Sequence, residues 1–157
     1  MAQQLWLLRH GDAEPHEARP DPERRLTPRG ESQATAAGRA LSALGVEFAT
    51  ALTSPRVRAA DTARLASESL GVQPTVHEPL SGGFDADDAR AVMSGEEPDA
   101  RVLLVGHEPD FSQVVQDLTG ARVDLKKGGV AAVRLDGSRA ELIALLRPRD
   151  LQALSAG

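Results

Sequence analysis

Short apolar runs alternate with segments of helical periodicity along the whole chain, and this alternation limits the possible folds more than any other feature. The apolar runs have strand length and cover residues 3–8, 48–53, 74–77, 101–105, 129–135 and 139–146. The helical segments cover residues 28–44, 55–70, 85–94 and 110–119, and a short one follows Pro148. Strands that alternate with helices favour a parallel sheet covered on both faces. We therefore predict a three-layer α/β sandwich with a mostly parallel central sheet and one antiparallel hairpin strand.

Polar residues mark where these helices begin. Thr27 and Ser54 each precede a proline, which is typical of an N-cap followed by proline at the first helical position. Asp110 is the expected cap of the helix over 110–119. Asp136-Gly137 lies between the last two apolar runs and predicts a tight hairpin. Residues 10–26 are polar and are expected to form a long loop, and loops of that length are usually functional or mobile.

Length and composition exclude several classes of protein. The 157 residues predict one domain over residues 1–157, and the absence of cysteine excludes disulfide bonds, thiolate metal sites and cysteine nucleophiles. A net charge of −5 argues against a nucleic-acid partner. No apolar run approaches the roughly 18 residues of a membrane span, and the N-terminus lacks the basic segment of a signal peptide. We therefore expect a cytoplasmic monomer that binds neither membrane nor nucleic acid.

Histidines and arginines follow the predicted strands where those strands end. Arg9 and His10 end the first strand, His107 follows the most apolar one, and Arg58 lies near the start of the helix after Ser54. Ligands of such sheets bind at the carboxyl ends of the strands, and a helix N-terminus there attracts anions. Arg56 is about 200° from Arg58 around a helix, so we expect it at the surface and only Arg58 in the pocket.

This set of residues suits phosphoryl transfer. An imidazole can attack phosphorus and form a covalent phosphohistidine. Neighbouring guanidinium groups disfavour the charged imidazole and keep it nucleophilic, and they also bind phosphate oxygens. A second histidine can bind the transferring group. The reaction requires no metal and no cofactor, and the sequence offers no obvious carboxylate cage for a metal ion.

Three blocks resemble the signatures of the histidine phosphatase superfamily, the relatives of phosphoglycerate mutase. They are LRHGDA at residues 8–13, SPRVRAADTA at 54–63 and VGHEP at 105–109. Asp61 stands where the family usually has glutamine. The short chain, the KKGG run at 126–129 and the RPRDL run at 147–151 look like the small SixA-type branch, the phosphohistidine phosphatases.

The resemblance implies a phosphoglycerate mutase-like fold and a role for each matching residue. His10 is the implied nucleophile, and Arg9 and Arg58 are the implied phosphate ligands. His107 is the implied second histidine of the pocket. Phosphate or sulfate is expected to bind there, within hydrogen-bond reach of all four side chains.

The implied substrate is phosphohistidine on a signalling or phosphotransfer protein. An imidazole leaving group has a pKa near 6.5 and departs more easily than an alkoxide, so a strong general acid is dispensable. One alternative is a small-molecule phosphomonoesterase with Glu78 as the acid. A second is a non-catalytic module that binds phosphate or a phosphoprotein. For the phosphohistidine reading, we expect Glu78 at the pocket rim or outside it, and an open mouth beside residues 81–83.

The remaining charged residues have simpler interpretations. Lys126 and Lys127 form either a solvated turn or a contact for an acidic substrate protein. Glu108 is expected to interact with the positive N-terminus of the next helix. His16 and His77 lie outside the motifs and are expected to be solvated.

Overall fold

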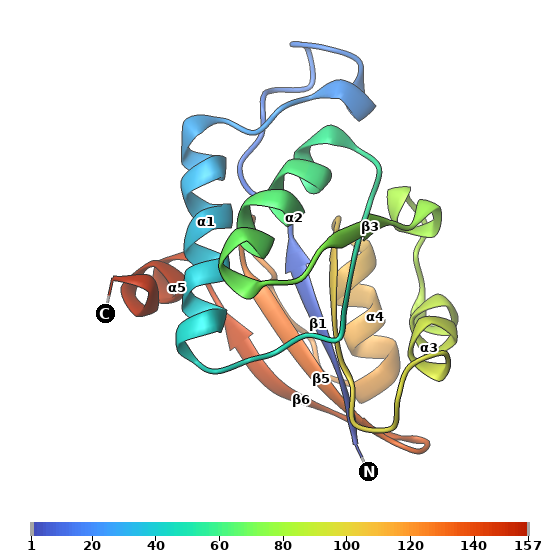
Figure 1. The fold of residues 1–157 in the computed structure, drawn as a ribbon. Helices are drawn as coiled ribbons and strands as arrows, with labels where there is room; N and C mark the ends of the chain where they lie inside the picture. Colours follow the sequence, from blue (N-terminus) through green and yellow to red (C-terminus); the bar gives the residue numbers. More distant parts are fainter. Residues whose placement is uncertain (1, 157) are drawn as a thin grey trace.

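A single sheet of six strands runs through the computed structural model, which describes residues 2–156 (Figure 1). The strand order is β3-β2-β4-β1-β5-β6; β5 is antiparallel to both of its neighbours, β1 and β6, and all other neighbouring strands are parallel. The strands are β1 (Gln3–Arg9), β2 (Thr50–Thr53), β3 (Pro74–Val76), β4 (Arg101–Gly106), β5 (Val130–Asp136) and β6 (Arg139–Leu146). The predicted mostly parallel sheet with a terminal hairpin is confirmed.

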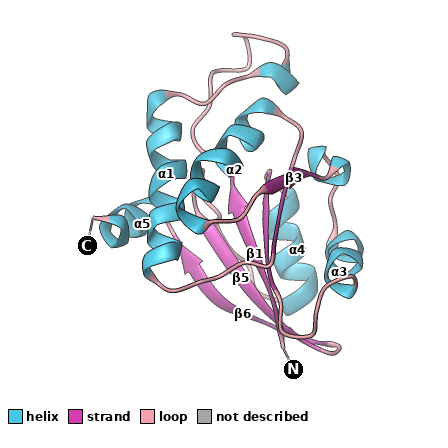
Figure 2. Ribbon diagram, in the orientation of Figure 1, coloured by secondary structure: helices cyan, strands magenta, loops and turns pink. Residues whose placement is uncertain are grey.

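Helices cover both faces of this sheet, as predicted (Figure 2). The α-helices are α1 (Pro28–Ala43), α2 (Val57–Leu70), α3 (Ala86–Ser94), α4 (Asp110–Thr119) and α5 (Pro148–Ser155). Two short 3-10 helices, η1 (Asp21–Glu23) and η2 (Glu78–Ser81), lie in the connections. Helices α1, α2 and α5 pack on one face, and α3 and α4 pack on the other. Within residues 2–156, no helix is both long enough and apolar enough to cross a membrane.

The core has two halves because side chains alternate across a strand. Leu5 and Leu7 of β1 point toward α3 and α4, whereas Trp6 and Leu8 point toward α1, α2 and α5. Burial on both faces explains why β1 reads as a continuous apolar run rather than an alternating one. The buried sheet fixes the positions of the loops at its ends, and those loops carry the polar residues of interest.

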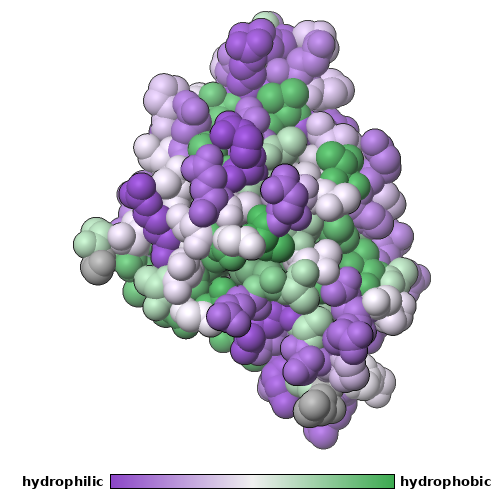
Figure 3. Space-filling model, in the orientation of Figure 1, coloured by the Kyte–Doolittle hydropathy of each residue, from purple (hydrophilic) through white to green (hydrophobic). Residues whose placement is uncertain are grey.

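The predicted long loop follows β1 at the carboxyl ends of the parallel strands (Figure 1). It contains η1, and Ala13 forms an isolated antiparallel bridge with Leu26. The Arg24 guanidinium is buried and donates to the carbonyl oxygen of Glu14 at 2.7 Å. Figure 3 shows hydrophilic residues gathered over this end of the molecule.

Two helix starts differ from the sequence prediction. Helix α2 begins at Val57 rather than after Ser54, and extended Arg56 is its N-cap. The Ser54 hydroxyl accepts from the Arg56 N–H at 3.2 Å and lies against His107, so it does not cap the helix. Likewise Asp110 is the first residue of α4 rather than its cap. The Asp110 carboxylate instead accepts from the backbone N–H of Gly83 at 2.9 Å.

Candidate active site

The sheet register places two histidines beside each other. Strands β1 and β4 are parallel neighbours in which Arg9 pairs with Gly106, so the next residue of each chain segment is a histidine. The ring centroids of His10 and His107 are 5.3 Å apart, and both side chains are buried. The backbone N–H of His10 also donates to the carbonyl oxygen of Gly106 at 3.1 Å, and this bond holds the two segments together.

His10 is held in one orientation by the backbone beside it. Its Nδ1 lies 2.7 Å from the carbonyl oxygen of Gly11. A carbonyl only accepts, so the proton sits on Nδ1 and the lone pair is on Nε2. The Arg58 Nε–H donates to this Nε2 at 3.3 Å. The unprotonated nitrogen of His10 therefore faces the guanidinium of Arg58.

Helix α2 is tied to the His10 loop through Thr62. The Thr62 hydroxyl donates to the carbonyl oxygen of Arg58 at 2.7 Å and accepts from the Gly11 N–H at 3.1 Å. A Cβ on Gly11 would lie 2.5 Å from the carbonyl oxygen of Gly30, so only glycine fits there. These contacts fix the distance between His10 and Arg58.

His107 and Arg9 complete the site with polar atoms that lack partners. His107 Nε2 lies 2.7 Å from Ser54 Oγ, and Arg9 Nη1 donates to the carbonyl oxygen of Leu125 at 2.9 Å. Among residues 2–156, three buried side-chain polar atoms have no hydrogen-bond partner: Arg9 Nε, His107 Nδ1 and Ser67 Oγ. Buried polar groups are normally paired, so two unpaired nitrogens in one site are unusual.

The electrostatics of the site keep both imidazoles uncharged. The pKa of His10 falls from 6.5 to about 4, mainly through burial; the Gly11 hydrogen bond opposes this shift, and the positive charges of Arg58 and Arg9 contribute to it. Burial, helped by His10 and Arg58, lowers the pKa of His107 to about 3. The pKa of Arg58 falls to about 10, mainly through burial, so this guanidinium still carries its charge at neutral pH.

Asp21 lies in the loop after β1 and was not predicted as part of the site. Its carboxylate forms an ion pair with Arg56 and lies 3.3 Å from Arg58 Nη2. Arg58 Nη1 also donates to the Asp21 carbonyl oxygen at 2.8 Å, and Arg24 Nη2 lies 2.9 Å from the other carboxylate oxygen. Three arginines thus surround one carboxylate.

The expectation of Arg56 at the surface was wrong. Arg56 precedes the first helical residue and has extended backbone angles, so the 200° helical separation from Arg58 does not apply to it. Both guanidinium groups reach Asp21, and Arg56 Nε donates to the carbonyl oxygen of Ser81 at 2.7 Å. Arg56 therefore connects the start of α2 to the loop after η2.

Of the other residues singled out from the sequence, some are exposed to solvent and others contact the rest of the protein. Glu78 is exposed, and its carboxylate has no hydrogen-bond partner within the described part of the chain. Glu108 accepts from the Ser112 N–H at 2.8 Å, which confirms its place at the N-terminus of α4. His16 is exposed as expected, but His77 is half-buried and packs edge-on against Phe84, which corrects the expectation of a solvated His77.

Lys126 and Lys127 are exposed, with ammonium groups 2.8 Å from the Asp124 carboxylate and 3.6 Å from the Asp12 carboxylate, respectively. No group of three or more histidine, aspartate or glutamate side chains among residues 2–156 is arranged to hold a metal ion.

Comparison with known proteins identifies the family signature and the fold. Residues 5–82 match the model of the histidine phosphatase superfamily (branch 1). An uncharacterized protein of Picosynechococcus sp. (strain ATCC 27264 / PCC 7002 / PR-6) is 34% identical over 151 residues, which cover 87% of each chain.

Solved structures share the whole architecture. The structure of the protein histidine phosphatase SixA complexed with tungstate is 25% identical, with a TM-score of 0.83 over 94% of this chain and 99% of that chain. The mycobacterial glucosyl-3-phosphoglycerate phosphatase is 18% identical, with a TM-score of 0.72 over 94% of this chain and 100% of that chain. The second likeness shows the fold alone.

Proposed function

The chain belongs to the histidine phosphatase superfamily and is of the SixA type, and from this membership we propose that it hydrolyses phosphohistidine on a signalling or phosphotransfer protein. The observation that carries the proposal is the contact between the unprotonated Nε2 of His10 and the Arg58 guanidinium. A nucleophile and a phosphate ligand thereby occupy the same few ångströms of the pocket.

In the first step, His10 Nε2 attacks the phosphorus of the substrate. The new N–P bond forms as the bond between phosphorus and the substrate imidazole breaks, and the electron pair of that bond goes to the leaving nitrogen. When the remote nitrogen of the substrate ring carries a proton, imidazole departs as a neutral molecule. The lowered pKa of His10 keeps its attacking lone pair free at neutral pH.

The arginines and His107 act on the phosphoryl oxygens. Charge on these oxygens is spread over the transition state, so fixed positive groups around them lower the barrier. Arg58 supplies its guanidinium, and Arg9 Nε and His107 Nδ1 are buried nitrogens still without partners that phosphoryl oxygens would satisfy. Water then attacks the phosphoryl group on His10, the N–P electron pair returns to Nε2, and inorganic phosphate leaves.

The likeness to SixA supports a phosphohistidine substrate, and the exposed Glu78 agrees with it. An imidazole leaving group does not depend on a strong general acid, whereas an alkoxide does. The second candidate is a phosphatase of small phosphate monoesters, because a phosphatase named for such a substrate shares this fold. That activity would require Glu78 or another acid to protonate the leaving oxygen.

A direct comparison of substrates tests the proposed function. A phosphohistidine peptide and a panel of phosphate monoesters are hydrolysed side by side by wild type and by Glu78→Gln. We expect a higher kcat/KM for the peptide, and a change on Glu78→Gln far below the roughly 10²–10⁴-fold typical of a lost general acid. Preference for monoesters, together with their loss in Glu78→Gln, would instead favour the second candidate.

The covalent intermediate gives a separate prediction for His10. Wild type incubated with ³²P-labelled substrate should trap phosphate in an acid-labile, base-stable bond, as a phosphoramidate requires. His10→Ala should lose both the label and turnover while keeping the circular dichroism spectrum of wild type. The assignment fails if the label is found on another residue or if the folded variant still turns over substrate.

A further inference from the structure

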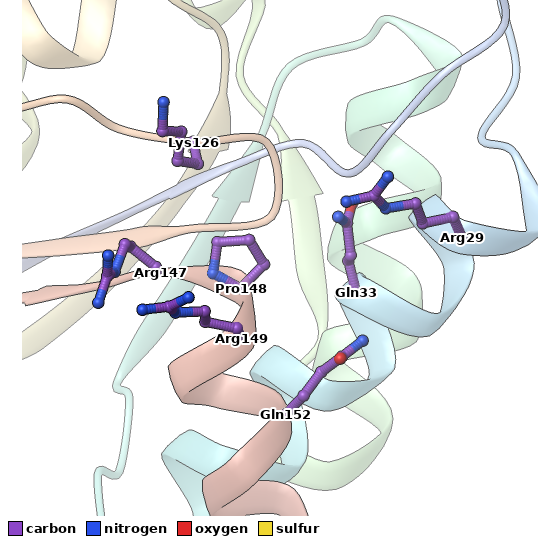
Figure 4. Close-up of a pocket in the computed structure, with 7 residues that line it drawn as sticks. All are labelled: Arg29, Gln33, Lys126, Arg147, Pro148, Arg149 and Gln152. Carbon is purple, nitrogen blue, oxygen red and sulfur yellow. The ribbon is translucent and has the colours of Figure 1, made fainter.

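A pocket between α1 and α5 is not used by the proposed chemistry. It has a volume of about 290 Å³ and lies between the first turns of α1 and α5 and the turn before β5 (Figure 4). Its lining residues are Arg29, Gln33, Lys126, Arg147, Pro148, Arg149 and Gln152. Figure 4 shows the arginines of the α5 start on one side and Arg29 and Gln33 of α1 on the other.

A second hollow adjoins this pocket and reaches Arg9 of the candidate active site. It has a volume of about 380 Å³ and shares Arg29, Gln33, Lys126 and Pro148 with the first. Its other lining residues are Arg9, Asp12 and Lys127. The Gly128 N–H donates to the carbonyl oxygen of His10 at 3.0 Å, so the turn that carries both lysines is fixed to the end of β1. Because they share four lining residues, we treat the two adjoining hollows as one groove, and Arg9 lines one end of it.

We name this groove the cationic trough, after five exposed side chains along it: Arg29, Lys126, Lys127, Arg147 and Arg149. Three carboxylates lie nearby: Asp12 is paired with Lys127, Asp124 with Lys126 and Asp150 with Arg147. Arg29 and Arg149 have no ion-pair partner within residues 2–156. The trough is therefore positive on a chain whose net charge is −5.

Helix stability does not explain the two unpaired arginines. Arg29 lies in the first turn of α1 and Arg149 in the first turn of α5, where the helix dipole disfavours a positive charge. Each helix already has its own cap: Thr27 accepts from the Gly30 N–H, and Asp150 accepts from the Arg147 N–H. Both arginines project from these ends at the surface, where an external anion can reach them.

The shape of the trough favours an extended acidic ligand over a single small anion. Its cations come from α1, from the turn before β5 and from α5, and they continue along both hollows rather than converging on one point. Gln33 adds a donor, because its side-chain oxygen already accepts from the Asp12 N–H at 2.8 Å and its amide N–H groups remain. Several carboxylates along a peptide match this arrangement.

We propose that the cationic trough docks an acidic segment of the phosphoprotein whose phosphohistidine enters the site at His10. This inference rests on the proposed function and names a feature of its substrate. The continuity of the trough with Arg9 places the acidic residues on the same face of the partner as the phosphorylated histidine. The turn with Lys126 and Lys127, open to two interpretations from sequence alone, then belongs to a docking surface.

The test uses three substrates and two double variants. The substrates are a phosphohistidine peptide with Asp and Glu on its flank, the same peptide with Asn and Gln there, and phosphoramidate. The variant R29Q/R149Q removes the unpaired cations of the trough, and R39Q/R122Q removes two exposed arginines elsewhere as the control for net charge. At low ionic strength, R29Q/R149Q should lower kcat/KM about tenfold for the acidic peptide only, and salt should abolish the difference.

Each other result would overturn the docking proposal. Equal losses for all three substrates would make the arginines part of the catalytic pocket, and an equal loss in R39Q/R122Q would reduce the effect to net charge. Isothermal titration calorimetry with the unphosphorylated acidic peptide measures binding to the trough without turnover. It therefore separates failure of docking from failure of phosphohistidine hydrolysis. Binding of inorganic phosphate, lost in R29Q/R149Q, without binding of the peptide would reassign the trough to small anions.

Discussion

His10 and His107 are buried without charge, although each lies a few ångströms from groups that could accept or donate a proton. Burial is the largest cause of both lowered pKa values, and the neighbouring arginines act in the same direction. In the proposed reaction the attacking nitrogen of the imidazole must be unprotonated, so this environment would select the reactive form of His10 at neutral pH. Keeping both imidazoles uncharged also has a consequence for stability.

Because of these two residues, the free energy of unfolding should decrease as the pH is lowered. The folded pKa values, about 4 for His10 and about 3 for His107, lie below the unfolded value of 6.5. Between pH 6.5 and pH 4 the unfolded chain therefore binds more protons than the folded chain, and the free energy of unfolding declines as pH falls. The decline should approach about 1.4 kcal/mol per pH unit for each histidine.

Urea unfolding at pH 7, 6 and 5 checks this slope. His10→Asn should remove about half of the pH dependence between pH 6 and 5, because one of the two buried imidazoles is then missing. His16→Asn is the matched control, since His16 is exposed and its replacement should leave the slope unchanged. A slope that persists in full in His10→Asn would contradict the prediction.

Arg58 and Arg56 make a second matched pair. Only Arg58 contacts His10, although both arginines bind Asp21. Arg58→Gln should weaken inhibition by inorganic phosphate about 10- to 150-fold, which corresponds to one charge-assisted hydrogen bond of about 1.5–3 kcal/mol. Arg56→Gln should have a smaller effect. If Arg56→Gln raises the inhibition constant as much as Arg58→Gln does, the assignment of the phosphate ligand is wrong.

At the scale of elements, the loop after β1 contributes more than the sequence indicates. Through η1 it places the Asp21 carboxylate on the arginines at the start of α2. A phosphoryl group that binds Arg58 has to share this guanidinium with Asp21. In the proposed function the carboxylate would therefore compete electrostatically with the bound phosphoryl group, while the Asp21 carbonyl oxygen accepts from Arg58 Nη1.

Asp21→Asn separates these two effects. The backbone carbonyl that holds Arg58 remains, but the negative charge is lost, so we expect inorganic phosphate to inhibit several-fold more strongly. Competitive inhibition of phosphoramidate hydrolysis gives the measurement. Glu23→Gln, which removes an exposed charge from the same 3-10 helix, is the control. Weaker inhibition in Asp21→Asn would mean that the carboxylate mainly orients the arginines.

Local sequence patterns predicted the helices and strands. The features that the sequence analysis missed depend on contacts between residues far apart in the chain. Gly71 and Gly120 end α2 and α4 with left-handed backbone angles, as a sequence pattern can predict. The start of α2 was misplaced because the Ser54 hydroxyl is bound to His107, which is 53 residues away in the chain. Asp21 was missed for the same reason, because its partners Arg56 and Arg58 lie 35 and 37 residues further on.

At the scale of the whole molecule, some positive charges lie where they do not stabilise the fold. The sheet is buried on both faces by apolar residues, and this burial supplies the main driving force for folding. The fold therefore tolerates surface charges at positions where they do not contribute to its stability. On a chain of net charge −5, cations collect around the N-termini of α1 and α5, where the helix dipoles oppose them. Such placement is typical of residues kept for binding rather than for stability.

Removing one of these charges should therefore stabilise the protein. Arg29 lies at the positive end of α1 and has no ion-pair partner among the described residues, so Arg29→Gln should raise the free energy of unfolding by about 0.3–1 kcal/mol. Arg39→Gln is the control: Arg39 is an exposed arginine in the same helix, but it lies beyond the first turn, where the dipole effect has decayed. Its replacement should change the free energy by less than about 0.5 kcal/mol. Urea denaturation at low ionic strength measures both variants, and added salt should shrink the gain from Arg29→Gln because the dipole interaction is screened. A loss of stability in Arg29→Gln would show that this arginine supports the fold, and its position at the trough would then need no function to explain it.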